Sequence, residues 1–296
     1  MTEPGAHGIL AASLTDVGLR RATNQDSFGE FERAAGTRLW VVADGMGGHR
    51  GGETASRVAV ETMGRVFGDA AEGTTPPDLL RAAFERANAE VHGLARRTPE
   101  LAGMGTTGVA LLLHDAAAWV GHVGDSRAYR MRGGRLEALT QDHSLVAELQ
   151  RRGFVTADEA AVHPRRNEVL RSIGIEPEVE VDLTALAVEP GDRFLLCSDG
   201  LCGVVPDDEI APVLSSETPE HAARRLVDLA IARGAPDNVT VQVVAIGDAA
   251  PARTSAPVPA VARRRGVRRV ALTAALTAAL LLAALLLLLA SGLSRP

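Results

Sequence analysis

The sequence predicts an α+β domain of packed antiparallel sheets with helices outside them, followed by a C-terminal transmembrane helix. The stretch 111–131 alternates apolar runs with turn residues at His114-Asp115 and Gly124-Asp125, which is typical of an antiparallel meander. Helical patterns occur in blocks and do not alternate with single strands, which disfavours βαβ units. A long uncharged apolar run near the C-terminus predicts the membrane span.

Six short runs of apolar or β-branched residues are the strand candidates. They lie at residues 39–43, 107–113, 117–123, 128–131, 194–197 and 239–245. The last run alternates in part between apolar and polar residues, as a half-buried strand does.

Five segments carry helical patterns. They lie at residues 52–67, 77–97, 144–152, 207–214 and 219–233. In the second segment, apolar side chains recur at the three- and four-residue spacing of an amphipathic helix. Pro77 suits a first helical turn, and Thr98-Pro99 predicts the end of this helix.

Residues 9–247 show neither an internal repeat nor a second linker, so they are predicted to form one domain. Residues 248–269 are rich in Ala, Pro and Arg, which predicts a juxtamembrane linker. Residues 270–290 contain only Ala, Leu, Val and two Thr. A helix of this length spans roughly 31 Å, the thickness of the bilayer hydrocarbon core. A soluble helix would show a polar face, and this segment has none.

Five arginines lie between residues 263 and 269, and one, Arg295, follows the apolar run. By the positive-inside rule, this asymmetry predicts a single-pass protein of the cytoplasmic membrane with the domain of residues 9–247 in the cytoplasm. The same arginines could contact anionic lipid headgroups, so membrane lipid is an expected partner.

Composition excludes several functional classes. All 31 basic residues are arginine, and the absence of lysine excludes a Schiff-base enzyme and a P-loop. Two cysteines make no disulfide framework, and no zinc-ligand spacing occurs. Residues 1–250 have 24 arginines and 37 acidic residues, a net charge of −13, whereas residues 251–296 carry +7. We therefore expect no nucleic-acid partner for the domain.

Four acidic motifs carry the candidate chemistry. They are Arg21-Ala-Thr-Asn-Gln-Asp26, Asp44-Gly-Met-Gly-Gly-His49, Ser198-Asp199-Gly200 and Asp237-Asn238. Asp44 and Asp199 each follow a predicted buried strand, where an unpartnered carboxylate is costly. Oxygen-only ligands favour Mg²⁺ or Mn²⁺. Two such ions can activate one water and hold a phosphoryl group, so the motifs together indicate phosphate-ester hydrolysis.

An arginine and a histidine accompany these aspartates. Arg21 could hold phosphate oxygens bidentately, and His49 could protonate the leaving alkoxide. Asp237 and Asp125 are weaker candidates, because Asp-Asn and Gly-Asp pairs are also common in ordinary turns.

Seven sequence pieces, in order, resemble the metal-dependent protein phosphatases of the PPM (PP2C) family, bacterial branch. The resemblance covers about residues 10–247. The pieces are Arg21-x-x-Asn-Gln-Asp26, Val42-Ala-Asp-Gly-Met-Gly-Gly-His49, Gly105-Thr-Thr107, Gly121-His-Val-Gly-Asp-Ser-Arg127, Thr140-Gln-Asp-His-Ser144, Cys197-Ser-Asp-Gly-Leu201 and Asp237-Asn-Val-Thr240.

This resemblance implies a four-layer αββα sandwich of two antiparallel sheets flanked by helices, with two Mn²⁺ or Mg²⁺ ions at one end. By position, Asp44 would bridge both ions, the carbonyl of Gly45 would bind one, and Asp199 and Asp237 would complete the centre. Gln25 departs from the family pattern, which usually has Glu at this position.

The remaining roles are implied in the same way. Asp125 would serve a third, weaker ion, and Asp26 would bind a metal or a metal-bound water. Arg21 would grip phosphate and His49 would act as general acid. Residues 144–177 correspond to the variable flap of the family. The flap carries five arginines, namely Arg151, Arg152, Arg165, Arg166 and Arg171. They could steer phosphorylated substrates or could simply be solvated surface charges.

The predicted function is that of a membrane-anchored protein serine/threonine phosphatase. It would hydrolyse phosphoserine and phosphothreonine with a metal-bridged hydroxide, and it would oppose bacterial Ser/Thr kinases, with phosphorylated proteins, those kinases included, as partners. Two alternatives stay open. One is a pseudophosphatase that binds phosphoproteins without turnover, and the other is a metallohydrolase of small phosphoesters.

Overall fold

The structure, a computed structural model, describes residues 8–33 and 36–247 of the 296-residue chain. The predicted linker at 248–269 and the predicted transmembrane helix at 270–290 lie outside the described residues. Within the described ranges, no helix combines the length and apolar character that a membrane crossing requires.

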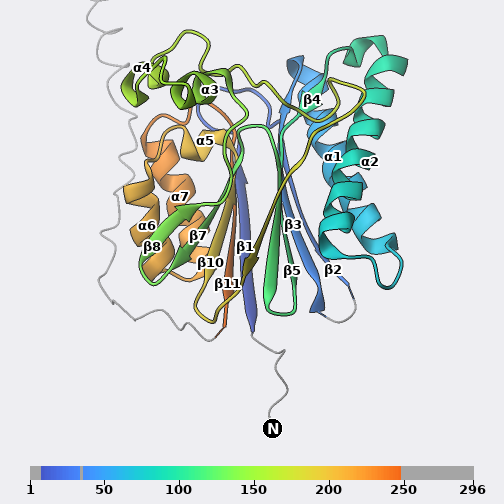
Figure 1. The fold of residues 1–296 in the computed structure, drawn as a ribbon. Coiled ribbons are helices and arrows are strands. Elements are labelled where there is room, and N and C mark those ends of the chain that lie inside the picture. Colours follow the sequence, from blue (N-terminus) through green and yellow to red (C-terminus); the bar gives the residue numbers. More distant parts are fainter. Residues whose placement is uncertain (1–7, 34–35, 248–296) are drawn as a thin grey trace, which may run out of the picture. The chain divides into compact units, whose positions relative to one another are not determined.

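Two antiparallel sheets form the centre of the domain (Figure 1). The first sheet has the order β1 (Ile9–Asp16), β11 (Val239–Ile246), β10 (Arg193–Cys197), β7 (Arg127–Arg132) and β8 (Arg135–Ala138). The second has the order β2 (Asp26–Glu32), β3 (Arg38–Met46), β5 (Gly108–His114), β6 (Ala117–Val123) and β9 (Asp182–Ala187), and the short β4 (Gly105–Thr106) pairs with the end of β3.

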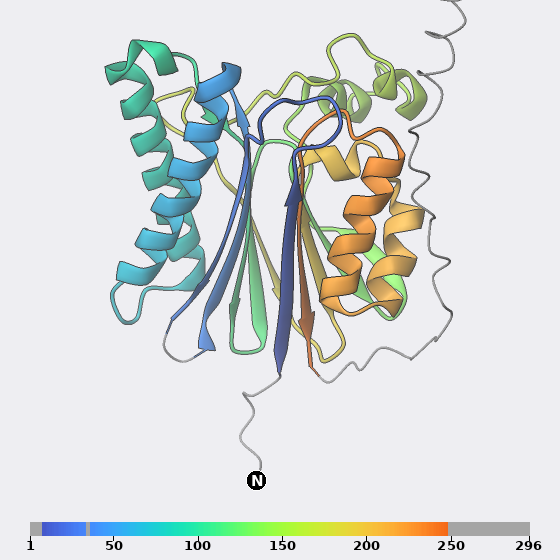
Figure 2. The same cartoon turned by 180° about the vertical axis from the view of Figure 1, so that it is seen from behind.

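Two long helices cover each sheet on its outer face, and Figure 2 shows the same layers from behind. Helices α1 (Gly48–Asp69) and α2 (Pro76–Arg97) cover the second sheet, and α6 (Asp207–Ser216) and α7 (Pro219–Ala232) cover the first. The short helices are η2 (Pro99–Leu101), α3 (Leu145–Arg151), α4 (Ala157–Ala161) and α5 (Asp199–Cys202). The predicted α+β class, with helices outside two antiparallel sheets, is confirmed.

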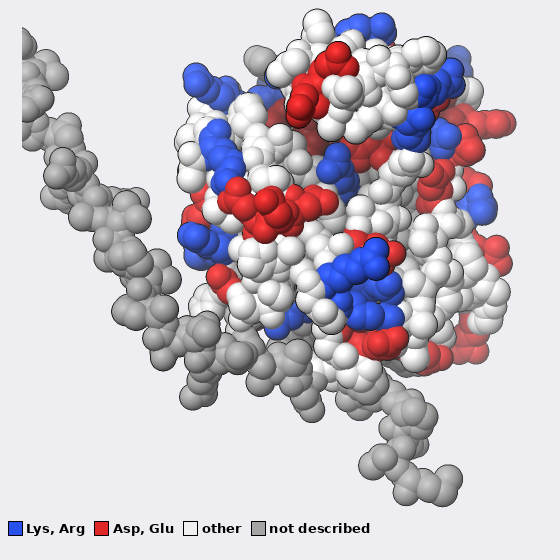
Figure 3. All heavy atoms as spheres, turned by 60° about the vertical axis from the view of Figure 1, so that its left-hand side comes forward, with Lys and Arg blue, Asp and Glu red and all other residues white. Residues whose placement is uncertain are grey.

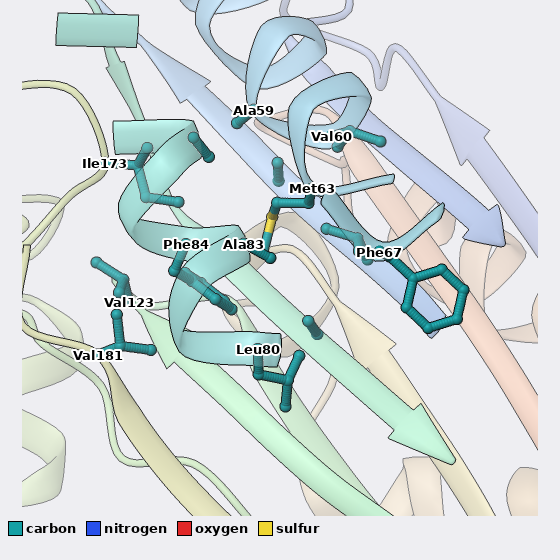
Figure 4. Close-up of a cluster of buried hydrophobic side chains, with 14 of the residues drawn as sticks. Ala59, Val60, Met63, Phe67, Leu80, Ala83, Phe84, Val123, Ile173 and Val181 are labelled. Atoms are coloured by element: carbon teal, nitrogen blue, oxygen red, sulfur yellow. The ribbon is translucent and has the colours of Figure 1, made fainter. Parts of the chain in front are cut away.

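Three apolar clusters hold these layers together. Between the sheets lie Trp40, Leu111 and Phe194, all essentially inaccessible to solvent. A second cluster, shown in Figure 4, packs α1 and α2 against the second sheet through side chains such as Met63 and Phe84. A third packs α6 and α7 against the first sheet. Full burial of each large side chain contributes about 1.5–3 kcal/mol, so these clusters fix the sheets rigidly behind the site.

Helix α2 shows how local sequence sets an element. The hydroxyl of Thr75 accepts a hydrogen bond from the Asp78 amide, and prolines occupy the first helical positions, where no amide donor is needed. Its buried residues follow the predicted stripe, so the predicted helix at 77–97 is confirmed with one residue added at its start.

Five strands were not predicted. One is the short β4, and the other four, β1, β2, β8 and β9, are the edge strands of the two sheets. Each of these edge strands is partly exposed to solvent on at least one face. For this reason none of them shows the continuous apolar run of the interior strands. Helix α1 also begins earlier than predicted, at Gly48.

Candidate metal centre

The predicted aspartates gather at one end of the two sheets, although they are far apart in the sequence. In the second sheet, Asp26 begins β2 and lies directly opposite Asp44 of β3. Directly opposed residues have Cβ atoms only about 4.5–5.5 Å apart, which brings these carboxylates together. The sequence predicted that Asp44 would follow the end of a strand. In the structure, Asp44 lies inside β3, which continues to Met46.

The first sheet contributes the other pair. Asp199 follows β10 as the first residue of α5, and Asp237 precedes the neighbouring β11, so both lie at the same end of that sheet. Gly200 makes the approach feasible, because a Cβ there would lie 1.9 Å from the carbonyl oxygen of Asn238. Only glycine therefore allows α5 to begin against the Asp237 segment.

A serine connects the two sheets at this end. The Ser198 hydroxyl donates to Asp26 Oδ2 over 2.8 Å and accepts from the amide of Thr240 over 3.0 Å. Asp125 completes the cluster from the turn between β6 and β7, which joins the two sheets. Next to it, Ser126 is hydrogen-bonded to Thr107, whose hydroxyl accepts from the Asp44 amide.

Asn238 holds the loop that carries Arg21. Its side chain accepts from the Gln25 amide over 2.8 Å and donates to the carbonyl oxygens of Val17 and Thr23. Arg21 Nη2 consequently lies 2.5 Å from Asp237 Oδ2, and half of the arginine side chain remains exposed. The structure thus places Arg21 at the cluster, with donors free to face a ligand.

Glycines shape the segment after Asp44. A Cβ on Gly45 would lie 2.1 Å from the carbonyl oxygen of Gly52, so the turn tolerates no side chain there. The Gln25 side chain donates to the Gly48 carbonyl, and its backbone carbonyl accepts from the Gly45 amide. The backbone of His49 enters the first turn of α1, but its side chain lies outside what the structure describes.

The aspartates of the cluster are crowded, and each is partly or fully buried. Burial, and then neighbouring Asp199 and Asp237, raise the pKa of Asp26 to about 7, although hydrogen bonds from Thr240 and Ser198 oppose this. Burial and four neighbouring aspartates raise the pKa of Asp44 well above its usual value.

The other carboxylates show the same cause. Burial, followed by Asp199 and Asp142, raises the pKa of Asp125 to about 7. The pKa of Asp199 is also raised, by burial and by Asp237. Such a cluster is unfavourable without cations, since burial and like charges both penalise ionisation.

The residues present fit divalent ions of the Mn²⁺ and Mg²⁺ class. Among the described residues, the buried atoms Asp26 Oδ1 and Asp199 Oδ1 have no hydrogen-bond partner. Buried carboxylate oxygens without partners are rare, and hard cations take such oxygens as ligands. The five described aspartates offer only oxygen ligands, which suit hard cations better than softer metals.

A groove of about 410 Å³ opens onto the cluster. Its lining includes Arg21, Asp125, Asp199 and Asp237, together with residues of α3 and α4 in the flap and Arg166. No carboxylate of the described residues lies within ion-pair distance of Arg166.

The other arginines that the sequence singled out in the flap are held by acids. Arg151 and Arg152 pair with Glu148, Arg165 pairs with Glu168, and Arg171 pairs with Glu180 and Asp182. On the face in Figure 3, basic and acidic side chains are likewise intermixed. Of the five flap arginines, Arg166 is therefore the remaining candidate for steering phosphorylated substrates.

Sequence reasoning missed several supporting residues. Ser198 and Asn238 were noted only as parts of motifs, and their long-range hydrogen bonds could not be seen from spacing. Asp142 binds Arg127 through two hydrogen bonds of 2.8 Å. Its presence in the quoted piece Thr140-Gln-Asp-His-Ser144 was the only available signal.

The two packed sheets and the acidic centre between their ends define a metal-dependent phosphatase. Comparison with known proteins agrees: the family described as Protein phosphatase 2C matches residues 20–230. The serine/threonine phosphatase stp of Listeria monocytogenes is 38% identical over 234 residues, which cover 78% of this chain and 93% of that protein.

Solved structures give the same answer. The serine/threonine phosphatase of S. agalactiae superposes with a TM-score of 0.76 at 38% identity, covering 80% of this chain and 99% of that one. The catalytic domain of the phosphatase PstP, solved with two manganese ions, superposes with a TM-score of 0.73 at 38% identity, covering 81% and 99%. The chain belongs to the protein phosphatase 2C family and is a serine/threonine protein phosphatase of the PPM type.

The comparisons confirm the predicted family, enzyme class and sandwich fold. The roles of the individual site residues, the number of ions and the membrane location stay predictions.

Proposed function

We propose that this phosphatase hydrolyses phosphoserine and phosphothreonine in proteins at the cytoplasmic face of the membrane, in opposition to bacterial Ser/Thr kinases. One observation carries the catalytic part of the proposal. Five aspartates from distant segments converge at one end of the sheets, and two of them present buried oxygens without partners. Such a site is organised for hard cations and, through them, for a phosphate ester.

Two divalent ions, when bound, would supply an activated water and neutralise phosphate charge. Asp44, Asp199, Asp237 and the carbonyl of Gly45 are the proposed ligands, with Asp26 beside them. Asp125 would serve a third, weaker ion.

The chain's own residues bind and orient the substrate. Asp237 holds Arg21 at the edge of the groove, and the remaining guanidinium donors can bind two non-bridging phosphate oxygens. Arg166, which also lines the groove, offers a second positive charge to an approaching phosphoprotein. His49, in the first turn of α1, is proposed to protonate the leaving serine or threonine oxygen.

The decisive experiment measures phosphate release from a phosphothreonine peptide by the full chain in detergent micelles, with Mn²⁺ or with EDTA. Turnover that needs Mn²⁺ supports the proposal. A folded protein that binds Mn²⁺ and phosphopeptide without turnover would instead identify a phosphoprotein-binding pseudophosphatase. Comparable rates with small phosphoesters would favour a general metallohydrolase.

The membrane part of the proposal depends on the sequence alone. The uncharged run 270–290 and the five arginines before it support a membrane anchor with the phosphatase domain on the cytoplasmic side. Sedimentation with anionic vesicles tests this by comparing the full chain with residues 1–252, which contain the compact domain. The full chain should partition into the vesicle pellet, and equal partitioning of the shorter chain would refute the anchor.

A further inference from the structure

His122, His143 and Asp182 form a second group of metal-ligand types, distinct from the acidic centre. One ligand atom from each lies within 4.8 Å of the others. His122 and Asp182 are directly opposed across β6 and β9, and the rings of His122 and His143 have centroids 4.7 Å apart. The group lies beside the turn that carries Asp125, so its chemistry bears on the acidic centre.

Hydrogen bonding decides what His143 can do. The Gly124 amide donates to Nδ1 of His143 over 3.1 Å, so Nδ1 must present its lone pair. In the neutral ring, the proton is then on Nε2, which donates to Asp182 Oδ2 over 3.1 Å. His143 therefore has no lone pair left for a metal, and its two nitrogens instead connect Gly124 to Asp182.

The backbone of His143 strengthens the same connection. Its amide donates to the Gly124 carbonyl over 2.7 Å, so His143 satisfies both backbone groups of Gly124. Gly124 needs this support because its φ is +110°, in the region that favours glycine. The preceding residue, Asp142, holds Arg127 on the other side of the turn. The turn around Asp125 is thus hydrogen-bonded on both sides: His143 bonds Gly124 before it, and Asp142 bonds Arg127 after it.

The same histidine lies at the base of the flap. The Leu170 amide donates to the His143 carbonyl over 2.6 Å, and Ser144 is bridged to Val169. Arg171, next in the chain, donates to Asp182 Oδ1 over 3.0 Å. His143 is therefore bonded both to the turn that holds Asp125 and to the returning end of the flap.

We propose that His143 is a positioning residue that couples the flap to Asp125, and that its Nδ1 acceptor sets the affinity of the Asp125 side of the centre for Mn²⁺. The inference rests on the proposed role of Asp125 as a metal ligand. Asp182 acts indirectly: by accepting from Nε2 of His143, it favours the tautomer in which Nδ1 can accept a hydrogen bond.

Two substitutions separate the functions of the ring nitrogens. Asn at position 143 can place an acceptor where Nδ1 lies, so His143→Asn keeps the bond from Gly124. Gln reaches toward the position of Nε2, so His143→Gln keeps a donor for Asp182 but leaves the buried Gly124 amide without a partner. His114→Gln is the matched control, because His114 ends β5 at the opposite end of the sheet and is partly exposed.

The experiment titrates the full chain in detergent micelles with Mn²⁺ by calorimetry and follows amide exchange at Gly124. His143→Gln should weaken the weakest Mn²⁺ site about tenfold and accelerate Gly124 exchange, as expected for a buried amide that loses its acceptor. His143→Asn should restore both, and His114→Gln should change neither. Wild-type Mn²⁺ affinity in folded His143→Gln, or an equal loss in His143→Asn, would overturn the inference.

A second pair keeps the test decisive if His143→Gln does not fold. Asp182 is half exposed, so Asp182→Ala should fold and weaken the same site several-fold by freeing the tautomer, whereas Asp182→Asn retains an acceptor and should not. Unchanged affinity in Asp182→Ala would also overturn the inference. Failure of the wild-type chain to release phosphate with Mn²⁺ would count against the proposed function itself.

Discussion

The two halves of strand β3 differ sharply in what they contribute. Residues from Leu39 to Ala43 are fully buried and apolar, and they hold the sheets and helices together. The next residue, Asp44, is a partly buried carboxylate among four others, and its raised pKa marks an unfavourable ionised state. The same strand therefore stabilises the fold along most of its length and loses stability at its functional end.

This difference shows that the acidic end is maintained by the rest of the domain. Without cations, each ionised aspartate repels its neighbours and lacks solvation, and the apolar layers must compensate. Residues at such a site are expected to favour activity at a cost in stability. The predictions below separate these two contributions.

The largest effect is expected from Asp44→Asn. Activity with Mn²⁺ should fall more than about a hundredfold, because even residues that only support metal ligands can contribute that much. In EDTA, the melting temperature should rise, since one repelling charge is removed at nearly constant shape. Rates from phosphopeptide assays and melting curves with and without Mn²⁺ check both parts. A lower melting temperature in EDTA would show that Asp44 stabilises the metal-free fold.

The opposite pattern is expected in the apolar region. Phe194 lies between the sheets and is essentially inaccessible, so Phe194→Ala should cost about 3–5 kcal/mol of unfolding free energy. Activity per folded molecule should change little at temperatures where the protein remains folded. Urea unfolding measures the loss. The control is Phe154→Ala in the flap, where the side chain is 70% exposed and the free energy should hardly change.

The sequence predicted the interior strands and long helices because each buries a continuous stripe or run. It did not reveal β1, β2, β8 or β9, since an edge strand needs pairing partners more than apolar side chains. The sequence also did not reveal that α1 begins at Gly48, because contacts from other segments decide this start. Glycines disfavour helix, but the Gln25 side chain and the packing around Gly45 hold this segment in place.

The acidic centre was predictable as a set of candidates and not as a geometry. The glycines beside Asp44 and Asp199 predicted strand ends, which is right for Asp199 and wrong for Asp44, because β3 continues to Met46. The family resemblance supplied the order of the motifs. Register and long-range hydrogen bonds then decide which groups meet. The contact of Ser198 with Asp26 spans 172 positions and that of Arg21 with Asp237 spans 216, so no local pattern encodes either.

The smallest expected effect is the pH dependence of the metal-free protein. Burial, reinforced by like charges, raises the pKa of Asp26 and of Asp125 to about 7, from about 4 in an unfolded chain. Between these values the folded state binds more protons than the unfolded state, so folding stability should decrease as pH rises from about 4 through about 7. Urea midpoints in EDTA at pH 5 and pH 8 measure this decrease, and Asp26→Asn should reduce it. Saturating Mn²⁺ should stabilise the protein more at pH 8 than at pH 5, because the ligands must be deprotonated. A urea midpoint in EDTA that stays constant or rises over this range would contradict the prediction. It would mean that the carboxylates are hydrated and that their ionisation does not lower the free energy of unfolding.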